Sequence, residues 1–201
     1  GFLNSYMSRM VGCVHRTRGI VDKYIGDAIM AIWGVPVSTG DDAFNAVNAA
    51  LMMREKLIEL NKSRGTVKRP FIRIGMGIHY GPVLAGQIGS EDRMEYTVIG
   101  DTVNLASRIE ALNKAFLTDI LITEETADLV EDRVRLHPME RIKVKGKRKP
   151  LQIYAVLGRL ANHDSPKNID ELRKLIGTYE LYRNNGGKPP SYEKESKYEV
   201  L

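Results

Sequence analysis

The chain has 201 residues, of which 43% are hydrophobic and 27% are charged, and its net charge is +5. This is the composition of an ordinary globular domain with one substantial hydrophobic core. The single cysteine, Cys13, excludes an intrachain disulfide, and the sequence has no run of roughly 20 apolar residues of the kind that spans a membrane.

The first elements are a helix and a hairpin. Residues 2–18 carry apolar side chains at helical spacing, which predicts a helix that Gly19 ends. Residues 20–24 and 28–33 are apolar and β-branched and predict two strands. Gly26 lies between them and tolerates the positive φ of a tight turn, so we expect the two strands to form a hairpin.

The hairpin presents charged residues. Asp27 lies in the turn, Lys23 stands on the strand that leads into it, and Asp22 is expected to be a surface strand residue. An acid and a base four residues apart on a hairpin suit a site for a metal-bound, negatively charged substrate. A plain turn aspartate and a solvated lysine are the alternative interpretation, and a second motif is needed to decide between the two.

A long helix and a glycine-containing strand follow. Residues 41–61 predict a helix with an aspartate cap. Residues 71–80 alternate between apolar and other side chains and predict a strand that contains Gly75 and Gly77. Two glycines inside a strand indicate the close approach of a helix or another backbone.

The second polar motif lies on a later helix. Residues 83–88 and 94–99 predict two more strands, and residues 101–113 predict a helix. Asn104 and Arg108 are four residues apart on this helix and therefore share a face. An amide and a guanidinium that project together can meet a sugar and a phosphate, although a solvent-exposed helical face is the alternative.

The remaining elements continue an alternation of helices and strands. Residues 120–123 predict a buried strand, residues 123–130 a short helix, and residues 134–144 and 151–157 a closing pair of strands. The alternation over residues 1–160 predicts an α+β sandwich in which helices pack on a sheet.

Much of the positive charge is concentrated in one run, residues 141–149, where Arg141, Lys143 and Lys145 alternate along a strand. Aromatic side chains are not interleaved there to stack nucleic-acid bases. The basic strand suits a polyphosphate ligand as well as it suits DNA, and of the two partners we expect the polyphosphate and no nucleic acid.

The composition changes after Leu160. Residues 168–182 predict one helix, and residues 186–190 with the charged residues beyond them predict a flexible end. We expect residues 161–201 to form a C-terminal extension outside a core domain of residues 1–160.

Four motifs occur in order along the chain. They are Asp22-Lys23-Tyr-Ile-Gly-Asp27, Gly75-Met-Gly77-Ile-His79-Tyr-Gly81-Pro82, Tyr96-Thr-Val-Ile-Gly-Asp-Thr-Val-Asn104-Leu-Ala-Ser-Arg108 and Val144-Lys145-Gly146. Together they closely resemble the catalytic domain of class III nucleotidyl cyclases, the adenylyl and guanylyl cyclases, over residues 1–160. The resemblance implies a ferredoxin-like α/β sandwich of the nucleotidyl cyclase type. It also implies conversion of ATP to cyclic AMP and pyrophosphate in intracellular signal transduction.

The resemblance implies roles for individual residues. Lys23 matches the lysine that contacts the adenine ring, and Thr97 occupies the second base-recognition position. This lysine and threonine pair resembles the bacterial and bicarbonate-responsive adenylyl branch, since guanylyl cyclases usually carry Glu and Cys there. Asn104 matches the residue that orients the ribose, and Arg108 the residue that stabilises the transferring phosphate. Lys145 matches the lysine that contacts the terminal phosphates.

Asp27 matches one of two aspartates that hold two divalent metal ions, Mg²⁺ or Mn²⁺, in the family. The other aspartate lies on the family's first strand, upstream of the residues in this sequence. We therefore expect the sheet to lack this strand and the two-metal site to be incomplete. Either ordered sequence precedes these residues or the domain is truncated, and in the truncated case we expect weak or absent activity.

Family members dimerise head to tail, so the resemblance implies a homodimer with two shared active sites. It also implies a cytoplasmic output module of a longer chain with an upstream sensor or a membrane anchor. Two alternatives stay open, a guanylyl or mixed-specificity cyclase and a catalytically silent cyclase-homology module for dimerisation or regulation.

Overall fold

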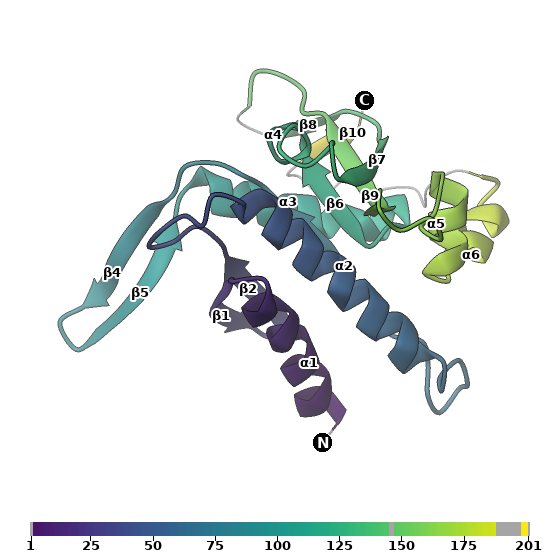
Figure 1. The fold of residues 1–201 in the computed structure, drawn as a ribbon, viewed down its shortest axis with the longest axis horizontal. Coiled ribbons are helices and arrows are strands. Elements are labelled where there is room, and N and C mark those ends of the chain that lie inside the picture. The colour runs from purple at the N-terminus through teal and green to yellow at the C-terminus, as the bar shows by residue number, and fades with distance from the viewer. Residues whose placement is uncertain (1, 145–146, 188–197, 201) are drawn as a thin grey trace. The chain divides into compact units, whose positions relative to one another are not determined.

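A computed structural model describes residues 2–144, 147–187 and 198–200 of the chain (Figure 1). The contacts among residues divide the chain into two units. Unit 1 comprises residues 1–72 and 81–104, and unit 2 comprises residues 73–80 and 105–201.

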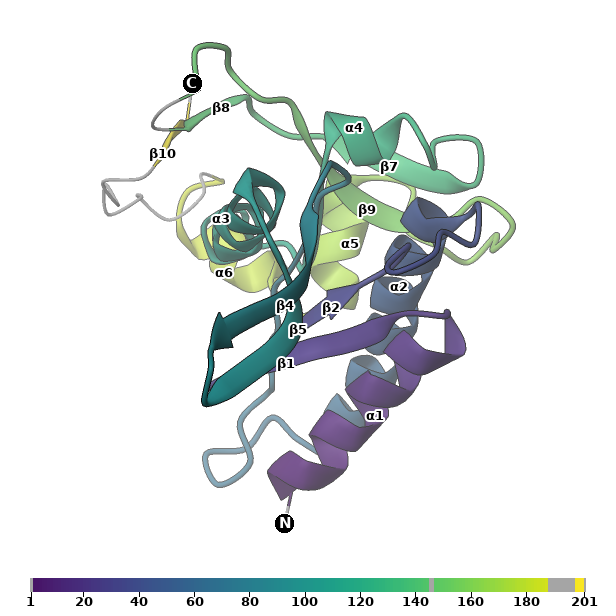
Figure 2. The ribbon, with the colours of Figure 1, turned by 90° about the vertical axis from the view of Figure 1, so that its left-hand side faces the viewer.

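Unit 1 combines helices with hairpins. Its elements are helix α1 (Phe2–Arg16), strands β1 (Ile20–Ile25) and β2 (Ala28–Ile32), helix α2 (Asp42–Asn61), and strands β4 (Leu84–Ser90) and β5 (Arg93–Ile99). β1 pairs antiparallel with β2, and β4 pairs antiparallel with β5, so both predicted turns produce hairpins (Figure 2). α1 packs against α2, and the buried apolar side chains of the two helices include Met10, Cys13, Val14, Ala46, Val47 and Ala50.

The end of α1 differs from the expectation. Arg18, not Gly19, adopts the left-handed conformation, with a φ of +64°, and the Gly19 amide donates to the Val14 carbonyl oxygen at 2.9 Å. Gly19 is needed for another reason, because a Cβ there would collide with the Trp33 ring. The Trp33 indole in turn donates to the Thr17 carbonyl oxygen at 3.1 Å, which ties the end of α1 to the residue after β2.

Unit 2 is organised around a mixed sheet with the strand order β3-β6-β9-β7. β3 (Met76–Ile78) runs parallel to β6 (Ile120–Thr123). β6 and β7 (Val134–Pro138) both run antiparallel to β9 (Ile153–Arg159).

Helix α3 (Asp101–Phe116) begins in unit 1 and continues from Leu105 in unit 2. Its apolar face supplies a buried cluster with the sheet, to which Leu105, Ile109, Leu112, Phe116, Leu121, Ile153, Ala155 and Leu157 belong. The other elements of unit 2 are α4 (Glu124–Ala127), β8 (Ile142–Val144), α5 (Ile169–Leu175), α6 (Tyr179–Asn184) and β10 (Tyr198–Val200), which pairs with β8. This mixed α/β architecture confirms the predicted α+β fold class. Within the described ranges, the helices are all too short or too polar to cross a membrane.

The strand predicted over residues 71–80 is wrong in extent, because β6 provides partners only for residues 76–78. The interpretation of its glycines is confirmed. A Cβ on Gly77 would collide with the backbone of Ala106 and Glu110 in α3, so the helix packs directly on this strand.

The predicted closing pair of strands is corrected as well. Residues 139–141 interrupt the strand predicted over residues 134–144, and only its first part, β7, pairs with β9. Beyond the interruption, Ile142 forms a single bridge with Leu151.

The helix predicted over residues 168–182 is instead two helices, α5 and α6. Gly177 lies between them with a φ of +74°, a conformation that ends a helix and that glycine adopts without strain. The local pattern of apolar residues carried no sign of this break.

The described part of residues 161–187 packs closely on unit 2. Leu172 is fully buried in the α3 cluster. Arg173 donates to the Phe116 carbonyl oxygen at 3.0 Å, and the Thr178 hydroxyl donates to the Leu117 carbonyl oxygen at 2.9 Å. These bonds satisfy carbonyls that the C-terminal end of α3 leaves open. A domain boundary at residue 160 stays a prediction.

Candidate functional site

The predicted base-recognition residues, Lys23 and Thr97, meet at Asp22 in unit 1. The Thr97 hydroxyl on β5 donates to the Asp22 carboxylate at 2.7 Å. The Lys23 ammonium lies 3.4 Å from the same carboxylate oxygen. The Asp22 side chain is 2% exposed, so the expectation of a surface residue is wrong, whereas the Lys23 side chain is 38% exposed.

A bulge in β1 explains how adjacent residues can both reach this point. Val21 pairs with Ala31 and Lys23 pairs with Met30, which leaves Asp22 as an extra residue without a partner in β2. Side chains of successive residues in a regular strand point to opposite faces, and a bulge re-aims them. Figure 2 shows β5 beside the β1–β2 hairpin, where Thr97 can reach Asp22.

Asp27 lies where the sequence predicts it, in the turn between β1 and β2. Gly26 takes a φ of +63° in this turn, and Asp27 is exposed. Burial, and after it the negative charge of Asp27, raises the pKa of Tyr6 on α1. The Asp27 carboxylate is therefore exposed to solvent and close enough to α1 for its charge to disfavour ionisation of Tyr6.

The donor set around Asp27 fits one kind of metal site. In the parts of the chain that the structure describes, no three His, Cys, Asp or Glu side chains gather to hold a metal ion. One exposed carboxylate fits a Mg²⁺ ion held mainly by substrate phosphates and water, which is a common arrangement for Mg²⁺. It does not fit a preformed cage of protein ligands within the described residues.

Asn104 and Arg108 lie on α3 one turn apart, and their spacing puts them on one face. Asn104 is exposed and falls in unit 1, whereas Arg108 is half-buried and falls in unit 2. The helix starts directly after Gly100, whose φ is +144° and whose carbonyl accepts from the Val103 and Asn104 amides at 3.2 and 3.4 Å. Asn104 is thus held in the first turn of the helix.

The predicted phosphate contact, Lys145, lies outside the described residues. The strand before it shows the predicted alternation. Lys143 is exposed on β8 between the buried Ile142 and Val144, and Arg141 is exposed as well.

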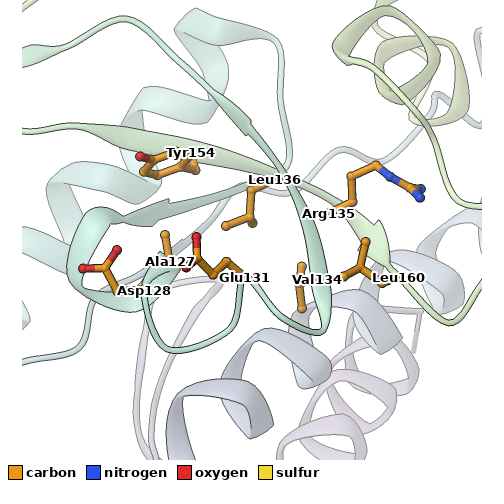
Figure 3. A pocket seen from close by; sticks show the side chains of 8 residues that line it. All are labelled: Ala127, Asp128, Glu131, Val134, Arg135, Leu136, Tyr154 and Leu160. Carbon is orange, nitrogen blue, oxygen red and sulfur yellow. The ribbon is translucent and has the colours of Figure 1, made fainter.

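A pocket of about 350 Å³ lies in unit 2 and contains none of the predicted site residues (Figure 3). Its lining includes the carboxylates of Asp128 and Glu131. Burial, and after it the charges of Glu124, Asp128 and Glu131, raises the pKa of Tyr154 beside them. Arg135 also lines the pocket, so its charged side chains are two carboxylates and one guanidinium. Because the acids outnumber the base and none of the predicted site residues lies here, we do not assign the triphosphate to this pocket.

Asp22 is the residue that sequence reasoning missed. An acidic side chain next to Lys23 in an otherwise apolar strand was the available signal. The bulge that buries it depends on the pairing of β1 with β2, which the sequence pattern does not reveal.

Comparison with known proteins shows the family to which this chain belongs. The family model of the adenylate and guanylate cyclase catalytic domain matches residues 1–158. An adenylate cyclase of Anabaena cylindrica is 40% identical over 164 residues, which cover 77% of this chain and 31% of that protein. The chain spans less than a third of the length of the bacterial adenylate cyclases that it matches.

Solved structures of both nucleotide specificities resemble this chain. The guanylyl cyclase Cya2 aligns with a TM-score of 0.71 and 32% identity. The adenylyl cyclase CyaB from P. aeruginosa aligns with a TM-score of 0.68 and 34% identity. Each alignment covers 83% of this chain and 83% of the other.

Proposed function

Because this chain belongs to the adenylate and guanylate cyclase catalytic domain family, we propose that it is the domain with which the full-length protein converts ATP to 3′,5′-cyclic AMP and pyrophosphate. The observation that carries the choice of ATP is the meeting of Lys23 and Thr97 at one carboxylate. A lysine donor beside a hydroxyl oxygen suits the edge of adenine, which offers a ring-nitrogen acceptor and an amino donor.

In this reaction the ribose 3′-hydroxyl releases its proton to solvent and its oxygen attacks the α-phosphorus in line. The bond between the α-phosphorus and the bridging oxygen breaks, and pyrophosphate leaves. Arg108 supplies a guanidinium that stabilises the charge on the transferring phosphate. Asn104, one turn earlier on α3, orients the ribose so that the hydroxyl is aligned for attack. Lys145 contacts the terminal phosphates.

Asp27 holds the divalent metal in this proposal. A Mg²⁺ or Mn²⁺ ion bound with the triphosphate would offset phosphate charge and favour ionisation of the 3′-hydroxyl. A second ion, which the family resemblance implies, is part of the proposal. The described residues provide one carboxylate toward such a pair.

We further propose that the chain acts as a homodimer with shared sites. The hairpins of unit 1 expose large apolar side chains, which are Tyr24, Ile25, Leu84, Met94, Tyr96 and Ile99. Exposed apolar side chains gathered on hairpins support an interaction surface, and a second copy is the partner that the family implies. We also propose that the chain is the cytoplasmic output module of a longer protein that carries an upstream sensor or a membrane anchor.

A guanylate or mixed-specificity cyclase is the second candidate, because Cya2 resembles this chain as closely as CyaB does. Product analysis separates the candidates. The full-length protein is offered ATP or GTP with Mg²⁺ or Mn²⁺, and the cyclic product is identified by chromatography and mass.

We expect cyclic AMP from ATP, and we expect Arg108→Ala to lower kcat by about 100-fold or more. Lys114→Ala, an exposed charge on the same helix, is the control and should stay within about twofold of the parent protein. Cyclic GMP alone would make the protein a guanylate cyclase. No product from either nucleotide would favour the silent dimerisation module.

A further inference from the structure

The Asp22 carboxylate fixes the direction of the hydrogen bond that it makes with Thr97. A carboxylate can only accept, and the Thr97 hydroxyl has a single proton, which it donates to Asp22 over 2.7 Å. Any further partner of the Thr97 oxygen must therefore be a donor. Without Asp22, the Thr97 hydroxyl could either donate or accept a hydrogen bond. With Asp22 beside it, the hydroxyl can only accept from a nucleotide base.

The same carboxylate holds the second base-recognition residue. Its oxygen lies 3.4 Å from the Lys23 ammonium, which has three protons and can donate to another group while it stays near Asp22. The Lys23 side chain is more open to solvent than Thr97, which is 6% exposed. The lysine donor is therefore the more accessible of the two groups to a nucleotide base.

This donor and acceptor pair distinguishes the two purines. The edge of adenine pairs a ring-nitrogen acceptor with an amino donor, which complements a lysine donor and a threonine acceptor. The corresponding edge of guanine pairs a ring N–H donor with a carbonyl acceptor, which mismatches both residues. Each mismatch leaves a polar group unpaired, which costs more than a missing contact.

We propose that Asp22 is a positioning residue that makes the site selective for adenine, because its carboxylate sets Thr97 as an acceptor and holds Lys23 as the donor. The Asp22 side chain is 2% exposed, so its effect on the base is exerted through Thr97 and Lys23. The β1 bulge that brings it beside Lys23 is then part of the specificity device. This inference rests on the proposed function.

Binding of nucleotides that cannot cyclise tests the inference apart from turnover. The dissociation constants of 3′-deoxy-ATP and 3′-deoxy-GTP with Mg²⁺ are measured by titration calorimetry on the full-length protein. Asp22→Asn keeps the shape of the side chain but lets the Thr97 hydroxyl turn and donate to guanine. We expect this change to lower the preference for the adenine analogue by about tenfold.

Asp92→Asn is the matched control, because Asp92 lies exposed in the turn between β4 and β5. It should leave the preference within about twofold of the parent protein. A merely structural Asp22 would weaken both analogues by the same factor in Asp22→Asn, and an unchanged preference would overturn the inference.

The same hydrogen bond can be tested from its other end if Asp22→Asn does not fold. Thr97→Ser keeps the hydroxyl that donates to Asp22 and should retain the preference, whereas Thr97→Val removes it and should lose about tenfold. Equal preference in these two variants would overturn the inference. A parent protein that binds the adenine analogue selectively but forms no cyclic product contradicts the proposed function and leaves the role of Asp22 standing.

Discussion

Replacing Asp27 distinguishes its proposed role as a metal ligand from a role in the turn alone. Asparagine suits the turn as well as aspartate does, so Asp27→Asn should leave the thermal unfolding midpoint nearly unchanged. It removes the negative charge that a divalent ion needs, and we expect cyclase turnover at fixed Mg²⁺ to fall by about 100-fold or more. The measurement is turnover against Mg²⁺ and Mn²⁺ concentration, and an unchanged metal dependence would leave Asp27 as a turn residue.

His137 on β7 links the stability of unit 2 to pH. Burial, and after it the charge of Arg173, lowers the pKa of His137 below its usual value of 6.5, while Glu140 and Asp170 act in the opposite direction. The folded chain therefore favours the neutral ring. Between the lowered pKa and 6.5, the unfolded chain binds a proton that the folded chain does not. The His137 contribution to stability is thus complete above pH 6.5 and falls as the pH drops below that value.

His137→Gln should remove this part of the pH dependence. Unfolding midpoints are compared between the variant and the parent protein from neutral to mildly acidic pH, so that the common titration of carboxylates cancels. His163→Gln, at an exposed histidine, is the control and should follow the parent curve. A variant curve parallel to the parent curve would show that His137 does not carry the effect.

At the scale of elements, β3 and α3 are in direct backbone contact through Gly77. A Cβ at this position would meet main-chain atoms of Ala106 and Glu110, which cannot move aside as a flexible side chain can. We expect Gly77→Ala to destabilise the protein by about 3 kcal/mol in urea unfolding. In Gly86→Ala, on β4, the added Cβ meets nothing within 4 Å, so this control should change stability by about 0.5 kcal/mol or less.

Helix α5 is a further element whose contribution can be measured. Arg173 donates to the Phe116 carbonyl oxygen and lies 3.9 Å from the Tyr182 ring centre. Arg173→Ala removes a buried hydrogen bond from a charged donor together with the cation–π contact, so we expect a loss of about 2–4 kcal/mol in urea unfolding. The exposed Arg183→Ala on α6 is the control, with an expected change of about 0.5 kcal/mol or less. Equal effects of the two changes would mean that α5 does not stabilise unit 2.

Elements with strong local signals were predictable from the sequence. α2 and α3 follow apolar periodicity, and Gly26 marks the β1–β2 turn. The strand predicted over residues 71–80 was too long, because the length of a strand depends on its partner and β6 pairs with only part of this segment. The prediction of one helix over residues 168–182 was wrong, because the left-handed Gly177 interrupts an otherwise continuous apolar stripe.

The candidate site was predictable in part for the same reason. Lys23, Asp27, Asn104 and Arg108 lie on the elements that their neighbours predict. Asp22 was missed because its burial comes from a bulge that two strands create together, and because its partner Thr97 is far away in sequence. Long-range pairing of this kind leaves no trace in a local pattern.

At the scale of the whole molecule, the proposed homodimer divides the site residues between two copies of the chain. The family resemblance assigns the metal aspartate, Asp27, to one protomer and the base, ribose and phosphate contacts to its partner. Each chain would then contribute its metal aspartate to one site and its base, ribose and phosphate contacts to the other, so neither site is complete in a single chain.

Complementation between inactive variants tests this division. Asp27→Asn and Arg108→Ala should each be nearly inactive alone. When the two are co-expressed, half of the dimers are mixed, and each mixed dimer has one site with both defects and one intact site. Turnover should therefore recover to about a quarter of the parent value.

The control pairs two changes on the same side of the shared site. Asn104→Ala co-expressed with Arg108→Ala leaves one defect in every site of a mixed dimer, so no recovery is expected. If each site is instead formed within one protomer, Asp27→Asn with Arg108→Ala also fails to recover at any ratio, because each chain then carries its own defect. Recovery in the first pair and not in the second requires that Asp27 and Arg108 of the same working site come from different copies of the chain.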